Sequence, residues 1–84
     1  MKILKFFSKT CGPCKQMGKI LAGLESVEIQ EVDIAEDSNA GLIEQYGVKS
    51  IPTVVVVDGE GNAVKTFKGI TPLAEIEEAI GGVV

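Results

Sequence analysis

Residues 8–15 read Ser8-Lys9-Thr10-Cys11-Gly12-Pro13-Cys14-Lys15 and hold both cysteines of the chain. The preceding run, Ile3-Leu4-Lys5-Phe6-Phe7, has the length and aromatic content of a buried strand. Pro13 suits a first helical turn, and apolar residues then recur at helical spacing at Met17, Ile20, Leu21 and Leu24. The two cysteines are therefore predicted to lie where a strand passes into a helix.

The position of Cys11 at a predicted helix start favours thiol chemistry. Unpaired N–H groups and the helix dipole stabilise negative charge at a helix N-terminus, so a thiolate forms there more readily than elsewhere. Cys14 lies one turn further on and points toward the same end, so the two sulfur atoms can meet with little backbone movement. The pair is predicted to be a dithiol/disulfide switch.

Three other interpretations of the cysteine pair stay open from these residues alone. A zinc site needs more ligands than two cysteines in a chain without histidine can supply, so only a site shared between two chains fits. A purely structural disulfide is weak, because closing so small a loop removes little entropy from the unfolded chain. Two unrelated buried thiols would need neither Gly12-Pro13 between them nor a helix start. We expect no metal, and no cofactor besides the redox-active pair Cys11 and Cys14.

Composition and charge narrow the class of protein. The 84 residues suffice for one domain, 1–84, and the net charge is -4 with three phenylalanines and one tyrosine. We therefore expect no basic, aromatic surface for nucleic acid, and no stretch has the length of a transmembrane helix. Residues 1–7 are too short for a signal peptide, which makes the cytoplasm the expected compartment. Close-spaced cysteines there are normally reduced and only transiently oxidised.

Periodicity and turn residues place the other elements. We expect strands at 2–7, 27–34, 54–57 and 63–68, with the third buried on both faces and the fourth a wetter edge strand. We expect helices at 13–24, between the capping residues 36–39 and Gly47, and from Thr71-Pro72 to Gly81-Gly82. Gly18 is a candidate contact between the first helix and the sheet, or is simply tolerated. The fold class is α/β, a four-stranded mixed sheet in the order β-α-β-α-β-β-α with helices on both faces.

At this point the sequence resembles the thioredoxin family over nearly its whole length. Residues 11–15 (CGPCK) are similar to the family's active-site motif, residues 46–53 (YGVKSIPT) to its proline loop, and residues 67–69 (FKG) to the segment with the glycine that closes the site. The sequence has no counterpart of the N-terminal strand and helix of full-length thioredoxins. In size it is similar to glutaredoxins and to the small thioredoxins of archaea and some phages. The resemblance implies a thioredoxin-like sheet in which the strands follow the order second, first, third, fourth.

The resemblance also implies an activity, the reduction of protein disulfides by dithiol/disulfide exchange. Cys11 would be the nucleophile and Cys14 the resolving cysteine. Pro52 would be cis and would face this pair, while Ile51 would offer backbone groups to an extended substrate. The flat apolar docking surface would comprise Gly12, Pro13, Ile51, Pro52, Gly69 and Ile70. The expected partners are protein disulfide substrates and an electron-donating reductase similar to thioredoxin reductase, and the protein would act as a monomer.

Four positions depart from the family pattern. Thr10 and Phe7 stand where thioredoxins have tryptophans, which removes apolar docking area at Thr10 and leaves Phe7 to fill the core. Lys5 stands at the family's buried aspartate and Glu31 at its buried lysine, so the charges are exchanged. We predict that Lys5 and Glu31 form a catalytic pair beneath the cysteines, with Glu31 accepting a proton from Cys14. The alternative is that both side chains reach solvent.

Two other functions stay open beside this one. A glutaredoxin-like reductase would use glutathione, although Gly12-Pro13 between the cysteines stands against it. A binding subunit would borrow the fold to clamp a partner, as a thioredoxin can do for a phage polymerase. Serine at both cysteines would leave the binding role intact and abolish either reductase.

Overall fold

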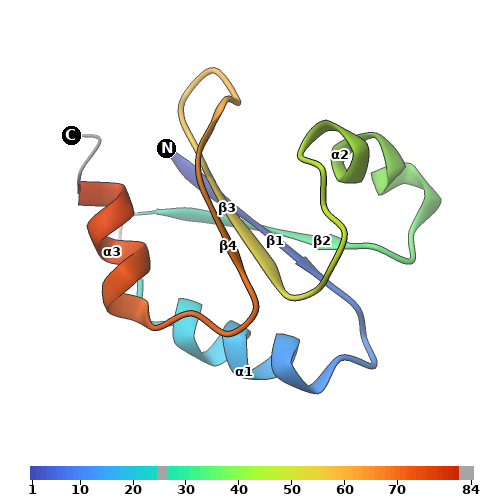
Figure 1. The fold of residues 1–84 in the computed structure, drawn as a ribbon, viewed down its shortest axis with the longest axis horizontal. Helices are drawn as coiled ribbons and strands as arrows, with labels where there is room; N and C mark the ends of the chain where they lie inside the picture. Colours follow the sequence, from blue (N-terminus) through green and yellow to red (C-terminus); the bar gives the residue numbers. More distant parts are fainter. Residues whose placement is uncertain (25–26, 82–84) are drawn as a thin grey trace.

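Four strands form one mixed sheet in the computed structural model, which describes residues 1–24 and 27–81 (Figure 1). They are β1 (Lys2–Phe7), β2 (Glu28–Asp33), β3 (Thr53–Val57) and β4 (Ala63–Lys68), in the spatial order β2-β1-β3-β4. β1 and β2 are parallel, and β3 is antiparallel to both of its neighbours. The predicted order is confirmed, and β1 and β2 are parallel because helix α1 (Gly12–Leu21) connects them.

The sheet is covered on both faces (Figure 1). Helices α1 and α3 (Leu73–Gly81) cover one face, and the 3₁₀ turn η1 (Asp37–Asn39) and helix α2 (Ala40–Gln45) lie on the other. Because side chains alternate along a strand, each face has its own core. The first comprises Ile3, Met17, Leu21, Val54, Val56 and Ile76. The second comprises Leu4, Phe6, Val32, Val55 and Val57, with Leu42, Ile43 and Tyr46 packed against it.

The third and fourth strands have the burial that their sequences predict. Every residue of β3 is buried, as expected for a β-branched run in the centre of a sheet. In β4 all residues except Phe67 are exposed, which confirms the wetter edge strand. A β-bulge near the hairpin turn shifts the register, since Val56 pairs with Lys65 while Val57 pairs with Ala63.

Helix α1 ends earlier than predicted, at Leu21 rather than Leu24. The backbone N–H groups of Gly23 and Leu24 donate to the carbonyls of Ile20 and Leu21, a tighter pattern than that of an α-helix. A Cβ atom at Gly23 would come within 2.8 Å of the Leu73 side chain. The helix therefore ends in a tight turn where Gly23 admits a side chain from the start of α3.

Helix α2 lies between residues 36–39 and Gly47 as predicted, but the side-chain cap expected at its start is not formed. The Asn39 amide donates to the carbonyl of Asp33, 2.9 Å away, and makes no cap hydrogen bond. The C-terminal prediction is confirmed, since Gly47 has a φ of 62°. Val48 N–H donates to the Ile43 carbonyl and Gly47 N–H to that of Glu44, the two bonds of a Schellman motif.

Helix α3 begins one residue later than predicted, at Leu73 rather than at Pro72. The Thr71 hydroxyl donates to the carbonyl of Gly69 rather than accepting from the helix, whose first residue is Leu73. Ile76 is fully buried, while Leu73 and Ile80 of the predicted stripe are half-buried. Gly81 belongs to the helix, and Gly82 of the predicted stop lies outside the described residues.

Candidate active site

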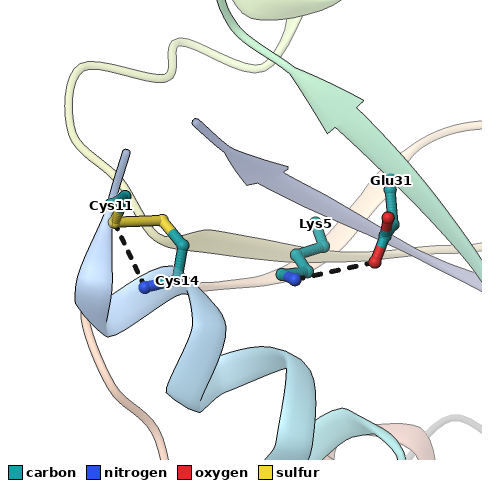
Figure 2. Close-up of polar contacts among 4 residues, drawn as sticks. All are labelled: Lys5, Cys11, Cys14 and Glu31. Carbon is teal, nitrogen blue, oxygen red and sulfur yellow. Dashed lines mark hydrogen bonds and ion pairs between the residues drawn. A yellow bond between two sulfur atoms is a disulfide. The ribbon is translucent and has the colours of Figure 1, made fainter. Parts of the chain in front are cut away.

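The cysteine pair lies at the first turn of α1, directly after β1 (Figure 2). Cys11 is the N-cap residue, and the backbone N–H of Cys14 donates to its Sγ over 3.1 Å. The two sulfurs are joined in a disulfide, with 5.2 Å between the Cα atoms. The N-cap sulfur thus receives one of the N–H groups that a helix start leaves without a backbone partner, the group that would stabilise a thiolate in the reduced protein.

The two cysteines differ in their access to solvent. Cys14 is only 1% exposed and belongs to the buried side of α1, whereas Cys11 is half-buried. Gly12 and Pro13, between them, are exposed. A disulfide of another molecule can therefore reach the sulfur of Cys11 and not that of Cys14.

The proline loop lies beside this helix start, since Figures 1 and 2 both place the turn before β3 next to the first turn of α1. The Ile51-Pro52 peptide bond is cis, as predicted. The Pro52 carbonyl accepts from Gly69 N–H at 2.9 Å, and the Thr53 hydroxyl donates to the Ser50 carbonyl at 2.6 Å. These bonds tie the loop to the end of β4, where Gly69 has a φ of 77°.

Three residues predicted to dock substrate lie on the surface of these two loops. Ile70 is 48% exposed, and Ile51 and Gly69 are half-buried. Within the described residues, the backbone N–H and carbonyl of Ile51 make no hydrogen bond. Pro52, also predicted to dock substrate, is buried and adds little exposed area of its own to this surface. The loop thus keeps a free backbone edge next to the half-buried cysteine.

Lys5 and Glu31 form the predicted ion pair, but only half of it is buried. They are register partners in the parallel pair β1 and β2, and Lys5 Nζ lies 3.6 Å from Glu31 Oε1 (Figure 2). The Lys5 side chain is 8% exposed and that of Glu31 is 61% exposed. The prediction of a buried pair is therefore wrong for Glu31, which lies on an edge strand of the sheet where one side has no neighbour.

The Lys5 ammonium fills a specific space between β1 and α1. It lies 5.1 Å from the centre of the Phe7 ring, within the range of a cation–π contact. A Cβ atom at Gly18 would come within 2.9 Å of Lys5 Nζ, so the contact proposed between Gly18 and the sheet is made by this side chain. Phe7, predicted to fill the core, is half-buried and lies on the same face of β1 as Lys5, because side chains alternate along a strand.

An open cleft of about 280 Å³ joins the ion pair to the resolving position of the cysteine pair. Its lining comprises Lys5, Phe7, Ser8, Lys9, Cys14, Lys15 and Glu31. Cys14 thus borders the same water-accessible space as the lysine and the glutamate.

Residues 1–24 and 27–81 contain no group of three or more cysteine, aspartate or glutamate side chains placed to hold a metal ion. Among the same residues, every helix is too short or too polar to cross a bilayer.

A cysteine pair at the start of the helix of a β-α-β unit, with a cis proline on the adjacent loop, defines a thiol-disulfide oxidoreductase site. Comparison with known proteins agrees, because the family model described as Thioredoxin matches residues 1–81. Thioredoxin of Alicyclobacillus acidocaldarius is 30% identical over 84 residues, 96% of this chain and 79% of that protein. Thioredoxin of Streptomyces clavuligerus is 36% identical over 76 residues, 88% and 70% of the two chains.

The solved structures agree with the sequence comparisons. Thioredoxin 1 of Thermosipho africanus superimposes with a TM-score of 0.77 at 26% identity, covering 99% of this chain and 93% of that one. The chain belongs to the thioredoxin family. It is a thiol-disulfide oxidoreductase that acts on protein disulfides, and the glutathione-dependent and binding-subunit alternatives are not favoured.

Proposed function

We propose that this oxidoreductase works as a reductant of protein disulfides in the cytoplasm, as a monomer and without a further cofactor. Its electrons would come from a reductase similar to thioredoxin reductase, which makes it a carrier in electron transport and cell redox homeostasis. The observation that carries the catalytic assignment is the difference between the half-buried Cys11 at the N-cap and Cys14 at 1% exposure. Attack on a substrate disulfide needs an accessible sulfur, and a second, sheltered sulfur can then resolve the mixed disulfide from within the molecule.

The reaction has two exchange steps. The Cys11 thiolate attacks one sulfur of the substrate disulfide, the other sulfur leaves as a thiolate, and a mixed disulfide forms. Cys14 then loses its proton and attacks Cys11 Sγ, which releases the second substrate thiolate and leaves the Cys11–Cys14 disulfide. Two electrons pass to the substrate, and the reductase returns two to the protein.

Substrate would dock across the loops that flank Cys11. An extended segment would pair with the free backbone N–H and carbonyl of Ile51, as a strand pairs with a sheet edge. Gly12, Pro13, Pro52, Gly69 and Ile70 would supply the rest of the surface. Because backbone hydrogen bonds do not depend on the side chains of the substrate, this surface would bind many sequences, as a reductase of several proteins requires.

Lys5 and Glu31 would serve the second step. Glu31 would accept the Cys14 proton across the shared cleft, directly or through one water molecule. The buried Lys5 ammonium would orient Glu31 through their ion pair and favour a thiolate on Cys14. Lys5 acts here as a positioning residue, because it works through these two groups.

The choice of electron donor tests this proposal. The oxidised protein is mixed with a disulfide-bonded protein and NADPH, with either thioredoxin reductase or glutathione plus glutathione reductase. We expect NADPH consumption with thioredoxin reductase that the variant with serine at both cysteines abolishes. NADPH consumption only with glutathione plus glutathione reductase would refute the proposed donor and assign a glutaredoxin-like function.

A further inference from the structure

Lysines gather around the cysteine pair of a chain that is acidic overall. The net charge is -4, with 8 basic and 12 acidic residues. Four exposed lysines nevertheless lie on the segments that form the site. These site lysines are Lys9, Lys15, Lys49 and Lys68.

Each site lysine is tied to the site by a neighbour. Lys9 and Lys15 line the cleft that Cys14 borders, and Lys49 lines a second cleft, of about 270 Å³, together with Ile51. Lys68 is the last residue of β4, where it pairs with Thr53 and precedes the glycine that bonds to Pro52. The four lysines therefore all lie on the segments that form the site.

The acidic residues near this end are paired, buried or on the segment between β2 and α2. In the described part of the chain the ion pairs are Lys2 with Glu28 and Lys5 with Glu31, so no site lysine takes part in one. Asp33 is buried and accepts from Ala35 N–H. Glu36 and Asp37 follow β2 on the segment that leads to α2, on the opposite face of the sheet.

Two other acidic residues lie far from the cysteines. Asp58 and Glu60 belong to the turn between β3 and β4, at the opposite end of the sheet, because Val57 pairs with Lys2 at the start of β1. Glu75, Glu77 and Glu78 are exposed on α3. The positive end of the molecule thus comprises segments 8–15, 49–52 and 68–70 near Cys11, which carry four lysines and no acidic residue.

We propose that this positive end selects disulfides whose flanking residues are acidic. The occupant is an extended polypeptide segment with aspartate or glutamate beside its disulfide, and the proposal rests on the disulfide reduction proposed above. Opposite charges raise the rate of encounter and orient the partner, and like charges reject basic segments. Thr10, next to Cys11, is polar and exposed, so apolar contact there is limited and charge has a larger share in recognition.

Three disulfide-bonded peptides that differ only beside the cysteine test the proposal: one with glutamate, one with glutamine and one with lysine at the flanking positions. The pre-reduced protein is mixed with each peptide, so no electron donor is needed, and the second-order rate constant is measured. At low ionic strength we expect the glutamate peptide to react about 3- to 10-fold faster than the glutamine peptide, and the lysine peptide more slowly still. The three rate constants should converge at about 1 M salt, where charges are screened within about 3 Å.

Paired variants locate the effect. Lys9→Gln with Lys15→Gln should remove most of the ratio between the glutamate and glutamine peptides. Lys19→Gln with Lys65→Gln changes the net charge equally at exposed positions in the last turn of α1 and the middle of β4, and should keep the ratio. The ratio is the readout because an effect on Cys11 itself cancels in it.

The outcomes separate this proposal from the proposed function. Equal rate constants for all three peptides at low salt would overturn the acidic preference and leave disulfide reduction standing. An equal loss of the ratio in both paired variants would assign it to net charge and also overturn the proposal. Failure of the reduced protein to react with any peptide would refute the proposed function itself.

Discussion

The ammonium of Lys5 occupies the space over Gly18 that a side chain on helix α1 would need. A Cβ atom at Gly18 would lie 2.9 Å from Lys5 Nζ and 3.9 Å from Lys5 Cε. The first distance is too short for ordinary contact, and the second is not. A charged residue on β1 and a glycine inside α1, each unfavourable alone, thus form one complementary feature next to the cysteine pair.

Gly18→Ala should therefore stabilise the protein only when Lys5 is shortened. Alanine is worth about 1 kcal/mol over glycine in a helix interior, but in the wild-type chain its Cβ must displace the ammonium. With Lys5→Met, whose side chain ends near the position of Cε, we expect the full gain of about 1 kcal/mol, against less than about 0.5 kcal/mol in the wild-type chain. Urea unfolding of the four proteins measures both values.

Gly41→Ala is the matched control for this cycle. A Cβ atom at Gly41, in α2, would meet nothing within 4 Å. Its effect on the free energy of unfolding should be the same with Lys5 and with methionine there. An equal gain from Gly18→Ala in both backgrounds would show that the ammonium does not occupy this space.

The half-buried ion pair gives a second prediction. Glu31→Gln leaves the Lys5 ammonium buried without its charged partner, and we expect a loss of about 0.5–1 kcal/mol, because Glu31 is mostly exposed and water screens the pair. Lys5→Met replaces a buried charge by an apolar group and should be neutral or stabilising. The double variant should match Lys5→Met, since Glu31 contributes to stability through Lys5.

The same variants test the catalytic role of the pair. The rate of disulfide reduction should fall in each of them, because proton transfer from Cys14 and the charge that favours its thiolate are both disturbed. Stopped-flow measurement of the single turnover gives this rate. Additive effects on stability together with an unchanged rate in Glu31→Gln would return both residues to a structural role.

The Asp58 carboxyl, in the turn between β3 and β4, should make the stability of the protein depend on pH. Backbone hydrogen bonds, from Asn62 first and then from Glu60, hold the pKa of its carboxyl below the ordinary value of 3.8. A lowered pKa in the folded state means that the ionised carboxylate stabilises the turn above pH 3.8. That contribution is lost as the pH falls below 3.8 through the folded-state pKa.

Asp58→Asn should accordingly flatten the acid side of the stability curve. Thermal unfolding of the wild-type and variant proteins, measured from about pH 6 down to about pH 2, should show their Tm values converging below the ordinary aspartate pKa. Glu60→Gln, in the same turn, is the control and should leave the difference between neutral and acid pH in place. Parallel curves for the wild type and Asp58→Asn would contradict the assignment.

The sequence predicts those parts of the site that depend on short-range patterns of residues. Cys11 and Cys14 are placed by the start of α1, and a helix between two strands makes them parallel, so the main site follows from short-range patterns. The exposure of Glu31 does not follow from the pattern of β2 alone, because it depends on the strand order, which the family resemblance implies and which makes β2 an edge. The cis state of Pro52 was expected only from the family resemblance, since most X-Pro bonds are trans.

The ends of the helices and the contacts of individual side chains are also not predicted correctly from the sequence. Helix α1 ends at Leu21 because Gly23 admits Leu73, a contact between residues far apart in the sequence. The side-chain caps predicted from Asn39 and Thr71 are wrong, because Asn39 donates to the carbonyl of Asp33 and Thr71 to that of Gly69. Phe7 was assigned to the core, and only the folded chain shows that it lies under the Lys5 ammonium.

The assignment of Cys11 as nucleophile and Cys14 as resolving cysteine is tested most directly by trapping the intermediate. The Cys14→Ser protein is reduced, mixed with a disulfide-bonded substrate and analysed by mass spectrometry under non-reducing conditions. We expect it to accumulate a mixed disulfide through Cys11, because no second thiol is present to release the substrate. The Cys11→Ser protein should form no mixed disulfide, because its remaining cysteine, Cys14, is not accessible. A Cys14→Ser protein that turns over normally, or a mixed disulfide that forms on Cys14 of the Cys11→Ser protein at the same rate, would contradict the account.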